Sequence, residues 1–204
     1  MTYDNNLFME HLRKMIQIPT VSNADPEKMD IEAFLKLHAY LEEAYPLVHQ
    51  KMTREVIGRA GLLYTWKGNG KSSQLPLMMT AHQDVVPEGD WSMWKYPPFS
   101  GEIADGFVWG RGSTDSKCNI QAYMDALELL IAEGFEPEYD LYFAFGYNEE
   151  IMGGPEPAAQ LIADELRRRN VQLGCLIDEC GGIQKTADGS QYGFIFTCEK
   201  GYAD

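Results

Sequence analysis

The stretch His82–Gln83–Asp84–Val85–Val86–Pro87 comes shortly after the apolar run Leu75–Pro76–Leu77–Met78–Met79, which is typical of a buried strand. Side chains two residues apart on a strand point to the same side, so those of His82 and Asp84 are expected to lie together. The ordinary alternatives are a structural histidine and a turn aspartate ahead of the proline. The carboxylate can instead accept a hydrogen bond from one imidazole nitrogen and leave the other nitrogen for a metal ion. The stretch therefore predicts a strand that ends in a metal-binding histidine.

Three further acidic sites stand in comparable settings: Asp115 within Gly110–Lys117, the pair Glu149–Glu150, and the pair Asp178–Glu179. Both pairs follow apolar runs that predict strands, whereas Asp115 precedes a predicted helix. Open α/β sheets bind ligands in the crevice at the carboxyl ends of their strands, so these sites and His82 are expected to meet at one edge. One histidine with several separate carboxylates suits a two-metal hydrolytic site.

Each carboxylate has a chemical interpretation and a structural alternative. Asp115 can bridge two metal ions with its two oxygens, or cap the helix that begins near Lys117. One member of Glu149–Glu150 can bind metal while the other takes a proton from water, whereas the alternative is a solvated acidic turn. Asp178 or Glu179 offers a further ligand by the same logic.

The remaining pattern predicts an α/β fold with a mixed, largely parallel sheet flanked by helices, because predicted strands alternate with predicted helices of ten or more residues. Helical spacing occurs near residues 8–16, 26–45, 117–133 and 155–170. Strands are predicted near 53–57, 62–66, 75–80, 140–147, 171–177 and 191–198, with an ordered loop over 87–106.

Composition limits the function further. With 204 residues and 45% hydrophobic content the chain can build one core, and a formal charge of −14 argues against nucleic acid or an anionic membrane as partner. No run reaches the roughly 18 apolar residues of a membrane span. Cys118, Cys175, Cys180 and Cys198 show no CxxC spacing, and the N-terminus lacks a secretory pattern. A cytoplasmic protein with reduced cysteines is expected.

Four motifs stand in the order of a known family: Ala81–Pro87, Gly110–Lys117, Asn148–Gly154 and Ile177–Glu179. In them the chain resembles the two-zinc peptidases that include aminoacylase, carboxypeptidase G, succinyl-diaminopimelate desuccinylase and the carboxypeptidase S type. The resemblance implies the catalytic-domain fold of those zinc peptidases. It also implies a hydrolase that cleaves the amide bond of N-acyl amino acids or short peptides.

The resemblance also implies a metal-ligand set. His82 would bind one zinc, Asp115 would bridge two zinc ions, and Glu150 would bind the second. Asp178, or Glu179 in its place, would complete the shell of the first. Cobalt or manganese would be able to replace zinc.

Two catalytic roles and one backbone feature follow from the same resemblance. Asp84 would support His82, and Glu149 would act as the general base. The bond between Asp115 and Ser116 is expected to be a non-proline cis peptide.

The resemblance further implies that residues 1–204 are the N-terminal portion of a catalytic domain, without the lid domain and the C-terminal catalytic segment. A last histidine ligand would come from that segment, so this chain alone is expected to turn over little substrate. The full-length protein would form a homodimer through its lid. The competing hypothesis is a non-catalytic, metal-binding remnant of the same fold.

Overall fold

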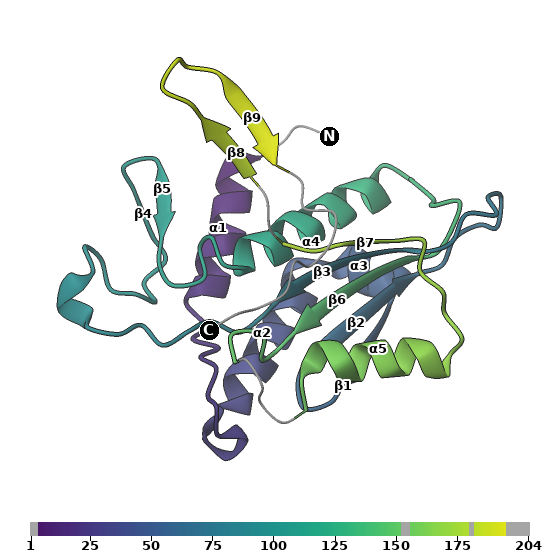
Figure 1. Cartoon of the computed structure of the whole chain (residues 1–204), viewed down its shortest axis with the longest axis horizontal. Helices are drawn as coiled ribbons and strands as arrows, with labels where there is room; N and C mark the ends of the chain where they lie inside the picture. The colour runs from purple at the N-terminus through teal and green to yellow at the C-terminus, as the bar shows by residue number, and fades with distance from the viewer. Residues whose placement is uncertain (1–3, 152–155, 180–181, 195–204) are drawn as a thin grey trace.

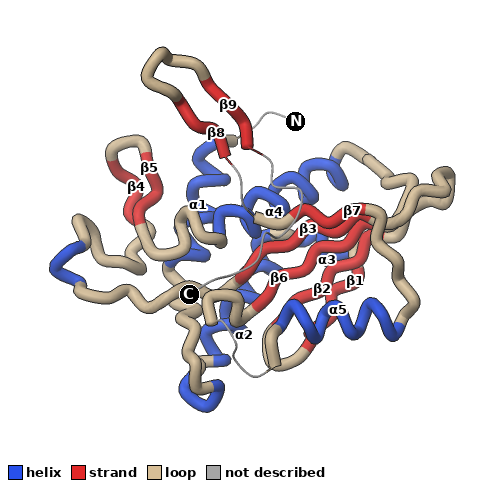
Figure 2. Tube along the Cα trace, in the orientation of Figure 1, coloured by secondary structure: helices blue, strands red, loops and turns tan. Residues whose placement is uncertain are grey.

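A five-stranded mixed sheet lies at the centre of the computed structural model, which describes residues 4–151, 156–179 and 182–194 (Figures 1 and 2). Its strands, in the spatial order β1-β2-β6-β3-β7, are β1 Thr53–Ile57, β2 Gly61–Trp66, β6 Leu141–Gly146, β3 Leu77–His82 and β7 Cys175–Ile177. The pairs β1/β2 and β2/β6 are antiparallel, whereas β6/β3 and β3/β7 are parallel. The predicted α/β fold with a mixed sheet is confirmed.

Helices cover both faces of this sheet: α1 Asn5–Ile16, α2 Ile31–Ala44, α3 Pro46–Lys51, α4 Lys117–Ala132 and α5 Ala158–Arg168. On one face, α1 to α4 enclose a core that includes Tyr64 and Met124. On the other face, α5 packs Ile162 and Leu166 against Leu63 and its neighbours. Because successive strand side chains point to opposite faces, the adjacent residues Leu63 and Tyr64 belong to different cores.

The parallel strands β3, β6 and β7 place their carboxyl ends at the same edge of the sheet (Figure 1). The chain leaves each strand there in a loop, and α4 begins beside them. This edge is where the sequence predicted a ligand site.

The predicted helix over 26–45 is interrupted. A 3-10 turn, η1 Pro26–Lys28, ends before α2 begins at Ile31. Asp30 separates the two, because its side chain accepts a hydrogen bond from the Ala33 N–H at 3.3 Å and so caps α2. The short helix α3 was not predicted, and it begins at Pro46 in the first-turn position that proline favours.

Two predicted strands differ from the structure. Of residues 171–177 only Cys175–Ile177 form a strand, because Val171 and Leu173 pack on the core beneath α5 instead. Residues 191–194 form β9 (Gln191–Phe194), which pairs with β8 (Gly182–Lys185) in a separate hairpin (Figure 2). The predicted continuation over 195–198 lies outside the described residues.

The predicted loop over 87–106 contains a 3-10 turn, η2 Trp91–Met93, and the strand β4 Glu102–Ala104, which pairs with β5 Phe107–Trp109. Cys118 and Cys175 are free thiols, whereas Cys180 and Cys198 lie outside the described ranges. None of the helices within those ranges is long and apolar enough to cross a membrane.

Candidate metal centre

The carboxyl-end edge of the sheet collects acidic side chains around one imidazole. His82 is the last residue of β3, and its Nε2 atom lies 2.8 Å from Asp115 Oδ1. The same nitrogen lies 3.4 Å from Glu179 Oε1 and 3.8 Å from Glu149 Oε2. Residues from three loops that are far apart in the sequence therefore converge on a single ring nitrogen.

The segment just after α1 holds the loop that follows His82. The Thr20 hydroxyl donates to the Gln83 carbonyl at 2.6 Å, and the Val85 N–H donates to the Thr20 carbonyl at 3.0 Å. The Ser22 N–H in turn donates to the Val85 carbonyl at 3.0 Å. These bonds continue the sheet pattern past the end of β3 and fix the path of the backbone between His82 and Val85.

Gln83 has a positioning role that the sequence analysis missed. Its side chain points away from the acidic cluster, and its amide donates to the Ala60 and Phe145 carbonyls at 2.8 Å each. Its amide oxygen lies 2.8 Å from His38 Nε2. Burial lowers the pKa of His38, so the neutral imidazole is favoured here. The only signal in the sequence was a polar residue directly after an apolar strand.

Asp84 is fully buried and connects His82 with the two glutamates. The Asp84 main-chain oxygen lies 2.9 Å from His82 Nδ1, closer than the Asp84 carboxylate at 3.4 Å. The two carboxylate oxygens accept the N–H groups of Glu149 and Glu150, each at 3.1 Å. Two oxygens of Asp84 face Nδ1, so they hold a proton on that nitrogen and direct Nε2 at the acidic cluster.

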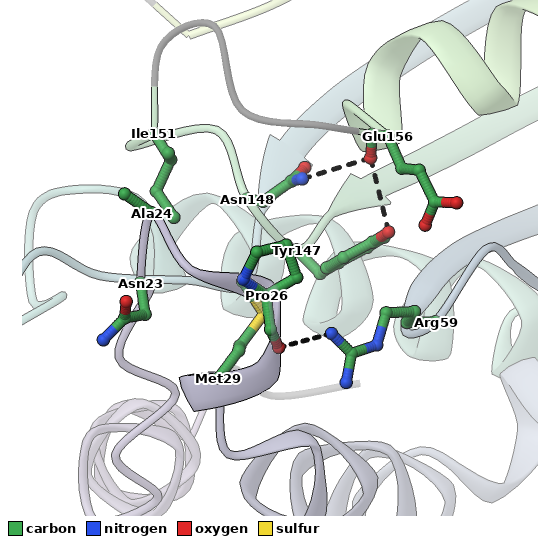
Figure 3. A pocket seen from close by; sticks show the side chains of 9 residues that line it. All are labelled: Asn23, Ala24, Pro26, Met29, Arg59, Tyr147, Asn148, Ile151 and Glu156. Atoms are coloured by element: carbon green, nitrogen blue, oxygen red, sulfur yellow. Dashed lines mark hydrogen bonds between the residues drawn. The ribbon is translucent and has the colours of Figure 1, made fainter.

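Asn148 fixes the loop that carries Glu149 and Glu150 (Figure 3). Its side-chain oxygen accepts the Ala158 N–H at 2.8 Å, and its side-chain nitrogen donates to the Glu156 carbonyl at 3.2 Å. The loop is thereby tied to the start of α5, so that the two glutamates stay beside His82.

Asp115 lies directly before Ser116, the residue at the N-cap position of α4. The Asp115 side chain does not cap this helix: its carboxylate faces His82, and within the described residues α4 has no side-chain cap hydrogen bond. The predicted non-proline cis peptide between Asp115 and Ser116 is confirmed.

Lys117 is a second residue whose role the sequence did not indicate. It is fully buried, and its ammonium donates to the main-chain oxygens of Met15 and Ile18 at 3.0 and 2.6 Å. Burial lowers the pKa of Lys117 to about 7. The side chain joins the end of α1 to the Asp115 loop.

The donor set fits a divalent cation. The described residues include two groups of potential metal ligands, and within each group the ligand atoms all lie within 4.8 Å of one another. One group is His82 with Glu149 and Glu179, and the other is His82 with Asp115 and Glu150. Burial raises the pKa values of Glu149 and Glu150, as do the neighbouring acids. Burial alone would lower the pKa of His82, but Asp84 and Glu179 raise it to about 11. A cluster this rich in negative charge favours a proton or a metal ion at its centre.

Asp178 and Glu179, the two residues predicted as alternative ligands, have different surroundings in the structure. Glu179 faces His82, whereas Asp178 Oδ1 accepts a hydrogen bond from the Thr80 hydroxyl at 2.5 Å and from the Glu179 N–H at 2.9 Å. Asp178 belongs to neither of the two groups of potential ligands. The structure therefore brings Glu179 beside His82 and pairs Asp178 with Thr80, and which of the two binds metal remains a prediction.

This placement predicts different results for two matched substitutions. Glu179→Gln is expected to weaken zinc binding by about 100-fold, because a ligand contributes roughly a quarter of a total binding free energy of about 10–16 kcal/mol. Asp178→Asn is expected to change the affinity by less than about tenfold. Competition with a chromophoric chelator measures both, and the reverse order of effects would restore Asp178 as the ligand.

Comparison with known proteins identifies the family of this chain. The family model described as peptidase family M20/M25/M40 matches residues 78–191, which include every acidic residue of the cluster. The chain belongs to this family. Its fold agrees, since the M20 family metallo-carboxypeptidase Sso-CP2 from Sulfolobus solfataricus superimposes with a TM-score of 0.65 at 19% identity, over 92% of this chain and 39% of that one.

Two relatives are closer to this M20 chain in sequence. Carboxypeptidase S of Saccharomyces cerevisiae is 37% identical over 98% of the chain. The N-fatty-acyl-amino acid synthase/hydrolase PM20D1 of Mus musculus is 38% identical over 94% of the chain. The chain spans about 36% of the length of each of these relatives.

Proposed function

We propose that this chain carries the metal-binding and proton-transferring part of a hydrolase that cleaves the amide bond of an N-acyl amino acid or a short peptide. The observation that carries the proposal is the convergence of carboxylates on Nε2 of His82. The names of the relatives support the substrate class, since one is a carboxypeptidase and another acts on N-fatty-acyl amino acids.

Two zinc ions fit the donors, with cobalt or manganese as substitutes. His82, Asp115 and Glu179 would hold the first ion, and Asp115 with Glu150 would hold the second, because the two oxygens of Asp115 can bind different ions. When bound, zinc supplies Lewis-acid polarisation of the scissile carbonyl and makes water more acidic.

Glu149 is the proton-transferring residue in this proposal. Its side chain is 56% exposed, and its Oε2 atom lies 3.8 Å from His82 Nε2. Partial burial, together with the charges of Glu179 and Glu150, raises the pKa of Glu149 and makes it a better base. It would take a proton from the attacking water and deliver it to the leaving amine.

The space that a substrate needs lies next to these groups. A cavity of about 560 Å³ is lined by His82, Glu149 and Glu179 and by apolar side chains that include Leu166 and Leu173. The cluster is therefore accessible from outside, as a hydrolytic site must be.

We further propose that the 204-residue chain alone turns over little substrate. The second ion has Asp115 and Glu150 as its assigned donors, fewer than the three protein ligands usual for catalytic zinc. The match covers 36% of carboxypeptidase S. We propose that the unmatched portion of such relatives supplies the missing ligand.

The experiment that tests the function joins this chain to the rest of a relative. In the hybrid, residues 1–204 replace the matching part of carboxypeptidase S, and the zinc-loaded protein is assayed on N-acyl amino acids and dipeptides. We expect hydrolysis that a chelator abolishes and added zinc restores, with little turnover by the chain alone. A folded, zinc-loaded hybrid that cleaves neither class would contradict the proposal.

A further inference from the structure

Strand β3 loses its neighbour on one side before it reaches the metal centre. The N–H groups of Leu77 and Gln83 donate to the carbonyls of Asp140 and Gly146, on the β6 side. Because the main-chain groups of a strand alternate in direction, those of His82 face the opposite side, towards β7. The pairing with β7 ends at Ile177, three residues short of His82 in the register of β3.

One hydroxyl occupies the place of the missing strand. The Ser116 Oγ atom accepts the His82 N–H at 3.0 Å and donates to the His82 carbonyl at 3.3 Å. Ser116 is fully buried and His82 is 2% exposed, so water cannot replace the hydroxyl as the partner of these main-chain groups. A single side chain therefore pairs both main-chain groups of the histidine, and an unpaired buried N–H or C=O would be unfavourable.

The position of Ser116 in the helix makes this use of the hydroxyl informative. Serine at an N-cap normally turns its oxygen to the N–H groups of the first helical turn. Among the described residues, Ser116 stands at the N-cap of α4 without such a bond. Its oxygen is committed to His82 instead.

We propose that Ser116 is a positioning residue that sets the separation of the first two metal ligands. It is covalently next to Asp115, and it clamps the backbone of His82. The Nε2 atom of His82 and the Oδ1 atom of Asp115 are thereby held 2.8 Å apart. This inference rests on the proposed function for its consequence in metal binding, but the clamp itself belongs to the metal-free chain.

The test compares three variants of the whole chain. Ser116→Ala removes the hydroxyl, Ser116→Thr keeps it, and Ser113→Ala makes the same chemical change three residues earlier in the same loop. Zinc affinity is measured by chelator competition, the cobalt-loaded protein is examined by visible absorption, and exchange of the His82 amide is followed by NMR in the metal-free chain. Thermal unfolding checks that each variant folds.

For Ser116→Ala we expect zinc affinity to fall by about 10- to 100-fold, with a changed cobalt spectrum and faster exchange at His82. The Ser113→Ala and Ser116→Thr variants should stay within about threefold of the wild-type affinity. Wild-type affinity and spectrum in a folded Ser116→Ala variant would overturn the proposal. If the Ser116→Ala variant does not fold, amide exchange in the metal-free wild-type chain is the test. A His82 amide that is not protected from exchange there would also overturn the proposal. If wild type binds no zinc, the proposed function fails, while the exchange measurement still tests the clamp.

Discussion

Alanine in place of His82 is expected to lower the affinity of the chain for zinc by about 100-fold, since one ligand contributes roughly 3 kcal/mol of the binding free energy. The loss should be similar to that expected for Glu179→Gln, because each substitution removes one donor that is assigned to the first ion. Chelator competition at constant pH measures the affinity, and elemental analysis measures the number of ions retained.

His49→Ala is the matched control for this substitution. His49 lies on α3, where its ring contacts the Tyr45 carbonyl and the Tyr64 hydroxyl instead of the acidic cluster. The control is expected to keep wild-type zinc affinity even where its thermal stability falls. Equal loss of zinc in both variants would show that the effect came from unfolding, and unchanged binding by His82→Ala would remove the histidine from the site.

Glutamine in place of Glu149 is expected to lower kcat of the hybrid enzyme by about 10²- to 10⁴-fold while its zinc content stays the same. The amide cannot accept the proton from water, but it keeps the size of the side chain. The main-chain N–H groups of Glu149 and Glu150 both donate to the buried carboxylate of Asp84, so the loop should keep its shape when either side chain is replaced.

The neighbouring Glu150→Gln substitution separates the two roles. It is expected to lose one of the two zinc ions, and activity only as a consequence, so that excess zinc restores part of the rate. If Glu149→Gln loses zinc instead, Glu149 is a ligand, an arrangement that its place in one of the two ligand groups allows. The assignment of the base would then be wrong.

The parts of the site that the sequence predicted are those that local patterns determine. The apolar run ahead of His82 forms β3, and the runs ahead of the two acidic pairs form β6 and β7. Parallel strands share one carboxyl edge, so the convergence of His82 with Glu149 and Glu150 followed from the strand assignments alone. Alternation along the strand likewise placed His82 and Asp84 on one side.

The choice between Asp178 and Glu179 could not be made in this way. Two adjacent residues after a strand have the same local sequence context, and which one reaches the cluster depends on where β7 ends. In the structure β7 is only three residues long, and the Thr80 hydroxyl binds Asp178, which leaves Glu179 facing His82. These are tertiary contacts with a residue nearly one hundred positions away.

Ser116 and Lys117 were missed for the same reason. The sequence analysis used Lys117 as the start of a helix and Ser116 for the expected cis peptide, and it gave neither side chain a role. Their side chains in fact bond to main-chain groups of β3 and of the end of α1. No periodicity in the sequence connects a helix start to the backbone of a strand 34 residues earlier.

Crystallography of the zinc-soaked chain at the zinc absorption edge tests the central claim most directly. The account predicts two anomalous difference peaks, roughly 3.5–4 Å apart, one beside His82 and Glu179, the other beside Glu150, with Asp115 between them. An ordered chain with no peak among these side chains, or with zinc bound only elsewhere, would contradict it.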